Sequence, residues 1–185
     1  MSVVIATVGR ETLQSAVDSA AWADQVVVVY DDEVVPETVP TGAETYACGP
    51  TRHWGAEQRN LGISKATGTH VAFLDDDDVY TGAAGEAVRR ALAAWPGRVH
   101  IFRMRRGDRV FGGYDCVWLG GIGTPMFIVP NDERIGSWTA RRAGDFDFIS
   151  STLGASRRRP RFHDELIALV DPQSAVRGRA ESRSV

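Results

Sequence analysis

Four consecutive aspartates, Asp75 to Asp78, are the residues with the clearest chemical potential in this chain of 185 residues. They follow residues 70–74, an apolar run typical of a buried strand. Carboxylates this close repel each other unless a cation offsets their charge, and oxygen ligands favour Mg²⁺ or Mn²⁺. In an extended segment Asp75 and Asp77 point the same way, so we expect them to share a ligand while Asp76 and Asp78 face elsewhere. The alternative is that aspartates here cap a helix N-terminus.

The segments that must position these aspartates alternate between strand and helix patterns. Short β-branched apolar runs predict buried strands at residues 3–8, 25–30 and 70–74. Helical periodicity predicts helices at residues 11–22, 54–66 and 81–94. This alternation predicts an α/β fold with a Rossmann-like, mostly parallel sheet covered by helices. In such sheets ligands bind beyond the carboxyl ends of the strands, where the aspartates stand.

The pattern changes after the third helix. Residues 98–129 are rich in glycine and in short strand-like runs, which predicts a mixed or antiparallel extension of the sheet. We expect a short helix at residues 145–154 and a last strand or helix at residues 165–170. The prediction is one domain over residues 1–171, with a first half (1–100) and a second half (101–171). Residues 172–185 have little to bury, so we expect a mobile tail.

Composition and charge narrow the class of protein. The net charge of −3 divides unevenly, because residues 1–100 hold 14 acidic and 7 basic residues, and residues 101–185 hold 10 acidic and 14 basic ones. An acidic first half suits a metal site, and a basic second half suits an anionic ligand. No run approaches the roughly 20 apolar residues of a membrane span, and no signal peptide is evident, so we expect a cytoplasmic protein without membrane insertion. Cys48 and Cys116 form no metal-binding pair, and we expect both to be partly buried free thiols.

Three segments together resemble a known family. Residues 59–78 look like the helix and strand that end in the D-x-D motif of family-2 glycosyltransferases, which have the glycosyltransferase-A fold. Residues 5–10 resemble the first strand of that family with its nucleotide-contacting turn, and residues 27–32 resemble its second strand. The resemblance is clear over residues 3–80 and weak beyond them. It implies that the parallel sheet binds a nucleotide, with a nucleotide-sugar-binding half (1–100) and an acceptor-binding half (101–171).

The resemblance implies a role for each matching residue. The nucleotide-sugar donor would be contacted by Thr7, Val8, Arg10, Asp31 or Asp32, Arg59, Asp75 and Asp76. Asp75 would lie near the ribose and the metal-bound water, and Asp77 would bind the metal. Uridine diphosphate is the nucleotide that the family favours, with Mn²⁺ or Mg²⁺ as cofactor.

The second half must supply the base that deprotonates the acceptor. In the family this base is an Asp that follows a Glu at a helix start, and Asp145 is the best match although Gly144 replaces the Glu. Asp147 is the second candidate for the base. A late histidine often completes the metal site in this fold, which makes His163 a candidate ligand. The arginines at 157–159 and 161 are either a binding site for an anion or a solvated loop.

These residues predict a metal-dependent, inverting glycosyltransferase of the hexosyltransferase type that transfers a sugar to a hydroxyl acceptor. The acceptor could be a polysaccharide, a small molecule or a hydroxylated base in nucleic acid. A non-catalytic nucleotide-sugar-binding module is the main alternative. A sugar nucleotidyltransferase is less favoured, because residues 7–11 contain one glycine where a triphosphate-binding loop needs several. The oligomeric state is not readable from the sequence.

Overall fold

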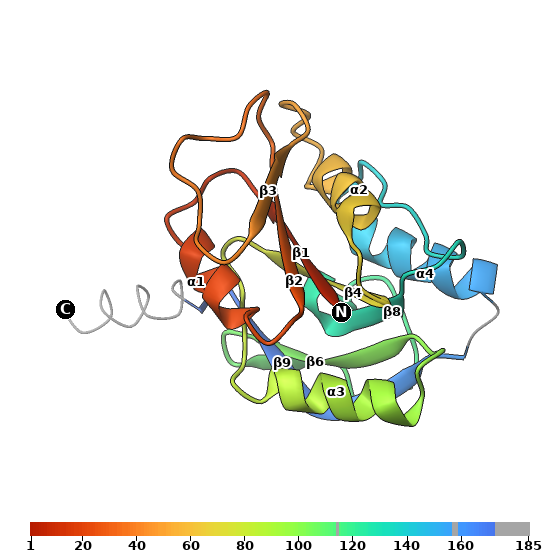
Figure 1. Ribbon diagram of the computed structural model, residues 1–185. Coiled ribbons are helices and arrows are strands. Elements are labelled where there is room, and N and C mark those ends of the chain that lie inside the picture. Colours follow the sequence, from red (N-terminus) through yellow and green to blue (C-terminus); the bar gives the residue numbers. More distant parts are fainter. Residues whose placement is uncertain (114, 157–158, 173–185) are drawn as a thin grey trace, which may run out of the picture.

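The computed structural model describes residues 1–113, 115–156 and 159–172, and in this part of the chain nine strands form one mixed sheet (Figure 1). The order along the sheet is β3-β2-β1-β4-β8-β6-β9-β5, with β7 paired to β6. The strands are β1 (Ser2–Thr7), β2 (Gln25–Tyr30), β3 (Glu44–Ala47), β4 (His70–Asp75), β5 (Val79–Tyr80), β6 (His100–Arg106), β7 (Arg109–Phe111), β8 (Phe127–Pro130) and β9 (Arg161–Val170).

The first half of the sheet is parallel, as the strand–helix alternation predicts. Strand β1 pairs in parallel with β2 and with β4, and β2 pairs in parallel with β3. The β-branched side chains of β1, β2 and β4 are buried from water, as expected of a sheet covered on both faces. β3 lies at the edge of the sheet and is absent from the strands that we predicted, and its short length and partial exposure explain the weak sequence signal.

The second half is mixed, and it determines which strand ends share an edge. β8 is antiparallel to both β4 and β6, and β9 is parallel to β6. Strands β6 and β9 therefore run in the same direction as β4 and β1. The last segment, expected as a strand or a helix, is a strand that begins at Arg161, and its far end pairs with the short strand β5. As a result, the carboxyl ends of β1, β2, β4, β6 and β9 all lie at one edge of the sheet.

Four α-helices cover the sheet in the described part of the chain. They are α1 (Leu13–Ser19), α2 (Ala56–Lys65), α3 (Ala84–Ala94) and α4 (Gly144–Ser156), and a 3₁₀ turn, η1 (Thr124–Met126), precedes β8. Helices α2 and α4 lie on one side of the sheet, and α1 and α3 lie on the other (Figure 1). The first three predicted helices extended one to three residues beyond the observed ends, except at the end of α3, which was predicted correctly. Helix α4 is instead longer than predicted at both ends.

An aromatic cluster joins α4 to the centre of the sheet. Phe73 of β4 contacts Phe148 of α4 and Trp138 of the preceding loop, each with ring centroids 5.1 Å apart. The rings of Trp138 and Phe148 stack at 4.7 Å, and Phe127 of β8 packs beside Phe148 at 5.6 Å. Because Phe73 lies two residues before Asp75, and Phe148 lies three residues after Asp145, this cluster brings the start of α4 toward the end of β4.

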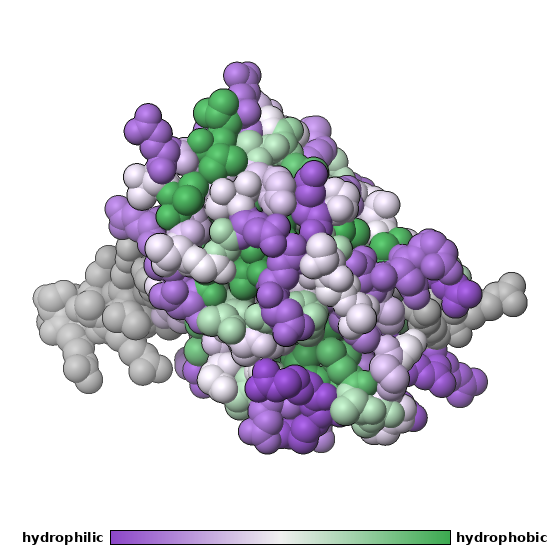
Figure 2. Space-filling model, viewed as in Figure 1, coloured by the Kyte–Doolittle hydropathy of each residue, from purple (hydrophilic) through white to green (hydrophobic). Residues whose placement is uncertain are grey.

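The surface is mixed in character. Figure 2 shows hydrophilic side chains spread over one face between smaller hydrophobic areas. None of the helices in the described residues combines the length and apolar character needed to cross a bilayer.

Both cysteines are free thiols; Cys48 is partly buried, but Cys116 is exposed, contrary to the expectation from sequence. The predicted tail, apart from residue 172, lies outside the described residues.

Candidate active site

A cavity of about 610 Å³ opens at the edge where the parallel strands end. Its walls come from the carboxyl ends of five strands and from the loop before α2. The lining residues are Ala6, Thr7, Val8, Arg10, Asp31, Arg52, Trp54, Gly55, Gln58, Arg59, Asp75, Asp76, Asp77, Asp78, Arg106, Val170 and Asp171. All four aspartates therefore lie at the position that the sheet topology favours for a ligand.

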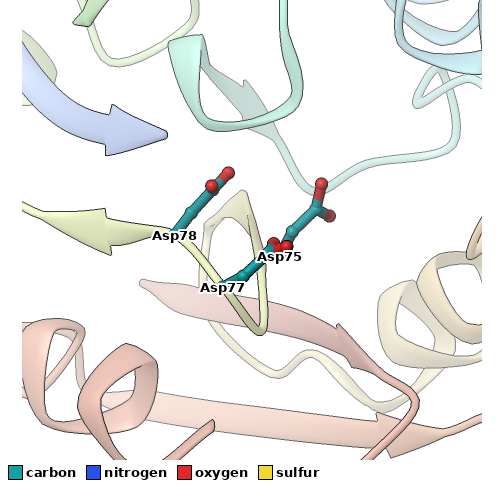
Figure 3. Close-up of side chains that lie close together, drawn as sticks. All are labelled: Asp75, Asp77 and Asp78. Carbon is teal, nitrogen blue, oxygen red and sulfur yellow. The ribbon is translucent and has the colours of Figure 1, made fainter. Parts of the chain in front are cut away.

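The aspartates follow a turn rather than an extended segment. The Asp78 N–H donates to the Asp75 carbonyl at 3.1 Å, so the chain reverses between β4 and β5. This turn brings Asp78 beside Asp75 and Asp77, and ligand oxygens of the three carboxylates lie within 4.8 Å of one another (Figure 3). The prediction that Asp78 faces elsewhere was therefore wrong. Asp78 also caps no helix, since its Oδ1 accepts the Asp171 N–H at 3.0 Å.

The electrostatics of this cluster favour a bound cation. Burial, together with the charge of Asp75, raises the pKa of Asp78 to about 8. Burial also raises the pKa of Asp77, while Arg10 partly opposes that shift. The charged forms of Asp77 and Asp78 are therefore unfavourable without a cation. Together with Asp75 they offer three oxygen ligands, a donor set that fits Mg²⁺ or Mn²⁺. Nothing in this set distinguishes between the two ions.

Asp76 has a different environment from its three neighbours. Its side chain is buried, and Oδ2 accepts the Thr7 hydroxyl at 2.6 Å and the Val8 N–H at 3.1 Å. The Arg10 guanidinium donates to its Oδ1. Asp76 thus joins β4 to the turn after β1. The sequence predicted Asp76, Thr7 and Arg10 as nucleotide contacts; all three line the cavity, but their polar groups already bind one another. Val8 lines the same wall with an exposed side chain.

Of the two aspartates after β2, the structure brings only Asp31 to the cavity. Its Oδ1 accepts the Thr51 N–H at 2.6 Å, and its Oδ2 accepts the Arg52 N–H at 3.0 Å. Asp31 thereby holds the loop that precedes α2. Asp32 is exposed and accepts the neighbouring Glu33 N–H at 2.7 Å, which is ordinary turn chemistry after a strand.

Arg59 connects the cavity to the core through helix α2. Arg59 is 5% exposed, and its guanidinium lies 4.5 Å from the centroid of a ring of Trp138. One terminal nitrogen donates to Asp75, and the other donates to the Trp54 carbonyl at 2.8 Å. α2 can approach the sheet this closely because Gly62 lies against Val4 of β1. Arg59 therefore holds Asp75 and the loop at the cavity in fixed relative positions.

Asp145 and Asp147, the two candidate bases, differ in their surroundings. Burial raises the pKa of Asp145, and the charges of Arg59 and Asp75 also act on its carboxylate. Asp147 instead accepts the Thr139 hydroxyl at 2.7 Å and pairs with Arg141 at 3.3 Å. Only Asp145 thus combines burial with electrostatic contact to the residues of the cavity, although it is not part of the cavity wall.

His163 does not join the aspartates. It lies at the amino end of β9, while Val170 and Asp171 at the other end line the cavity. Seven residues of strand separate His163 from Val170, or about 23 Å. The His163 Nε2 is 3.0 Å from His100 Nδ1, and its ring stacks on Phe102 at 4.4 Å. Among the described residues, the metal-compatible group contains Asp75, Asp77 and Asp78 and no histidine.

The basic segment near His163 also lies at the wrong edge to bind a diphosphate in this cavity. Arg161 begins β9 and packs over Trp95, with its guanidinium 4.5 Å from a ring centroid. Arg159 and Arg161 line a separate hollow beside Cys116, and residues 157 and 158 lie outside the described part of the chain. The second half contributes another arginine to the cavity, Arg106 at the end of β6.

Several lining residues were missed by the sequence analysis. Gln58 is 2% exposed, and its Oε1 has no hydrogen-bond partner among the described residues. Trp54 lies in a loop without a strong motif, and Asp171 follows a strand whose direction the sequence does not reveal. The one available signal was the position of Gln58, directly before Arg59 in the segment that resembles the family.

Comparisons with known proteins agree with this fold. The family model described as glycosyl transferase family 2 matches residues 2–109, more than half of the chain. The chain belongs to this family. No curated protein matches it.

Solved structures of TarS from S. aureus share the fold of this family-2 chain. One TarS structure matches with a TM-score of 0.68 at 16% identity, covering 91% of this chain and 36% of the TarS chain. TarS 1–349 in complex with UDP matches with a TM-score of 0.64 at 17% identity, covering 91% and 59%. TarS 1–349 in complex with UDP-GlcNAc matches at 0.63 and 17%, covering 91% and 57%. The chain thus spans less than two thirds of the TarS chains that it matches, and at this identity the likeness establishes the glycosyltransferase-A fold.

Proposed function

We propose that this protein is a metal-dependent, inverting glycosyltransferase that transfers a sugar from a nucleoside-diphosphate donor, a uridine diphosphate sugar, to a hydroxyl acceptor. The observation that carries the proposal is the convergence of Asp75, Asp77 and Asp78 at the carboxyl edge of a family-2 sheet. TarS, which has the same fold, has been crystallised with UDP and with UDP-GlcNAc, and this supports the choice of donor.

The metal would be held by Asp77 and Asp78, with Asp75 shared between the metal and Arg59. When bound, the cation would offset the negative charge of the departing diphosphate. Arg59 keeps Asp75 in position through its ion pair. Arg10 lies 3.7 Å from Asp77 and offsets part of the charge of the cluster.

The acceptor would be deprotonated by Asp145. A carboxylate whose pKa is raised by burial holds a proton more strongly, and is therefore a better base, than an exposed aspartate. In a direct displacement, the acceptor oxygen bonds to the anomeric carbon while the bond to the diphosphate oxygen breaks, and Asp145 takes the hydroxyl proton. Attack from the side opposite the leaving group inverts the anomeric centre. We propose a polysaccharide, a small molecule or a hydroxylated nucleic-acid base as the class of acceptor.

The proposal is tested by titration calorimetry of UDP with and without Mn²⁺. We expect UDP to bind the native protein in the presence of Mn²⁺, and Asp77→Asn to lose most of the metal-dependent affinity, because one anionic oxygen ligand is removed. Asp164→Asn is the matched control, since Asp164 is 88% exposed and pairs with Arg103 away from the cavity. Equal Mn²⁺-dependent binding by the native protein and Asp77→Asn would refute the metal site. Absence of binding by the native protein would refute the uridine donor.

A further inference from the structure

Trp54 is an exposed aromatic residue at the mouth of the cavity. Its side chain is 67% exposed, and among the described residues that line the cavity it is the only aromatic one. Large apolar side chains at the rim of a polar cavity mark surfaces where a ligand is bound. The other lining residues are mostly charged, so Trp54 provides the one flat apolar surface available to a ligand there.

The backbone around Trp54 is held firmly although its indole is exposed. On the amino side, the Asp31 carboxylate accepts the N–H groups of Thr51 and Arg52. On the carboxyl side, Arg59 donates to the Trp54 carbonyl at 2.8 Å. Arg52 and Trp54 have positive φ angles of 54° and 55°, which bulky residues rarely adopt and which such contacts must maintain. The loop thus holds an aromatic ring in a fixed position beside the cavity.

The path of this loop places Trp54 in one half of the cavity. Arg52 is bonded to Asp31, directly after β2, and a Cβ on Gly55 would be 3.2 Å from the Ala6 Cβ of β1. Trp54 therefore lies near the ends of β2 and β1, whereas the aspartate cluster follows β4. Two inter-strand spacings, about 10 Å, separate β2 from β4. A nucleoside diphosphate whose phosphates face the aspartates would direct its base toward Trp54.

We propose that the indole of Trp54 stacks on the nucleobase of the donor and that this contact contributes substantially to nucleotide affinity. The inference rests on the proposed function, because it requires the diphosphate to lie at the aspartates. Stacking on an aromatic ring is available to every base, since each base has a π face. In this arrangement Asp31 acts on the base indirectly, because it holds the loop that carries Trp54.

The test compares a ligand that has a base with one that lacks it. Affinities for UDP and for pyrophosphate, both with Mn²⁺, are measured for the native protein, Trp54→Ala and Trp54→Phe. We expect Trp54→Ala to weaken UDP binding by about 5- to 100-fold and to leave pyrophosphate binding nearly unchanged. Trp54→Phe should retain UDP binding within about threefold, because a smaller ring still stacks. UDP should also quench tryptophan fluorescence in the native protein and in the control Trp95→Phe, but much less in Trp54→Phe.

The outcomes separate this inference from the proposed function. If Trp54→Ala binds UDP as tightly as the native protein does, stacking is refuted while the donor site stands. If Trp54→Ala weakens UDP and pyrophosphate equally, Trp54 supports the loop and does not contact the base, which also overturns the inference. If the native protein binds neither ligand with Mn²⁺, the proposed function is refuted and the inference is refuted with it.

Discussion

Within the run of four aspartates, identical side chains have different environments because the chain turns between them. Asp75 pairs with an almost buried arginine, Asp76 is buried against the turn after β1, and Asp78 bonds to the end of β9. Asp77 is about one third exposed and lies near Arg10. A carboxylate that already accepts several protein donors has little capacity for a ligand. The side chains with remaining capacity are therefore Asp75, Asp77 and Asp78.

Asp145 provides a prediction at the level of a single residue. Asp145→Asn should lower kcat for transfer by about 10²- to 10⁴-fold, because an amide cannot accept the acceptor proton. Affinity for UDP with Mn²⁺ should stay nearly unchanged, since Asp145 is not part of the cavity wall. Because burial raises the pKa of Asp145, the rate of the native enzyme should fall with decreasing pH at higher pH than for an exposed aspartate. The measurement is steady-state transfer as a function of pH, together with calorimetry.

The same assay on Asp147→Asn distinguishes the two candidate bases. Asp147 bonds to Thr139 and Arg141, so its loss should affect the start of α4 more than the proton transfer. A collapse of turnover in Asp147→Asn, with Asp145→Asn still active, would assign the base to Asp147. A loss of UDP affinity in Asp145→Asn would instead assign Asp145 to the donor site.

At the level of elements, the close contact between α2 and β1 controls the position of Arg59. A Cβ on Gly62 would lie 2.2 Å from Val4 Cγ1, so Gly62→Ala should force α2 away from the sheet. Alanine favours helices by about 1 kcal/mol over glycine, but overpacking costs about 1–3 kcal/mol, and we expect net destabilisation. Chemical denaturation measures the change. Gly154→Ala in α4 is the control, because no atom lies within 4 Å of the added Cβ. A stabilised Gly62→Ala protein would contradict the packing argument.

The pairing of β6 with β9 contains a histidine pair that should make stability depend on pH. His100 Nε2 lies 3.1 Å from the Trp95 carbonyl, which can only accept, so Nε2 carries the proton and Nδ1 accepts from His163. Burial lowers the pKa of His100 from 6.5 to about 4. Below pH 6.5 the unfolded chain binds a proton that the folded chain excludes at His100. The contribution of His100 to stability should therefore fall by about 3 kcal/mol as the pH decreases from 6.5 to 4.

Denaturation at several pH values tests this dependence. His100→Phe should be less stable than the native protein at neutral pH, because the Trp95 carbonyl and His163 lose a partner. Its stability should nevertheless change less between pH 6.5 and 4, because the titrating group is absent. An equally steep loss in the variant would mean that another group causes the acid sensitivity, such as His163, whose pKa is also lowered by burial.

The first half of the fold was predictable because its signals are local. The apolar run at 70–74 indicates a strand, and the four aspartates that follow it indicate both the end of that strand and the position of the proposed metal site. The same residues are part of the segment that resembles the family. Which aspartates converge was not predictable, because one backbone hydrogen bond between Asp78 and Asp75 decides it. The position of His163 depends on the direction of β9, which is fixed by pairing with β6 some 60 residues earlier in the chain. No local pattern encodes such a contact.

At the level of the whole molecule, the cavity joins parts that are far apart in the sequence. The acidic first half supplies the aspartates, and the basic second half contributes Arg106 and the end of β9. The acidic half and the basic half therefore do not form two separate sites, since both meet at one edge of the sheet. A ligand in the cavity would contact strands from both ends of the chain, and its binding energy should stabilise the fold as a unit.

This coupling gives a prediction for thermal unfolding. With Mn²⁺ and UDP at about 100 times the dissociation constant, binding adds about 3 kcal/mol, which for a domain of this size raises Tm by about 5–10 °C. The rise should be much smaller with Mn²⁺ alone, because the diphosphate completes the coordination of the ion. Asp77→Asn should lose the ligand-dependent rise, while Asp164→Asn should retain it. If UDP and Mn²⁺ raise the Tm of Asp77→Asn as much as that of the native protein, the ligand binds elsewhere, and the edge of the sheet is not the donor site.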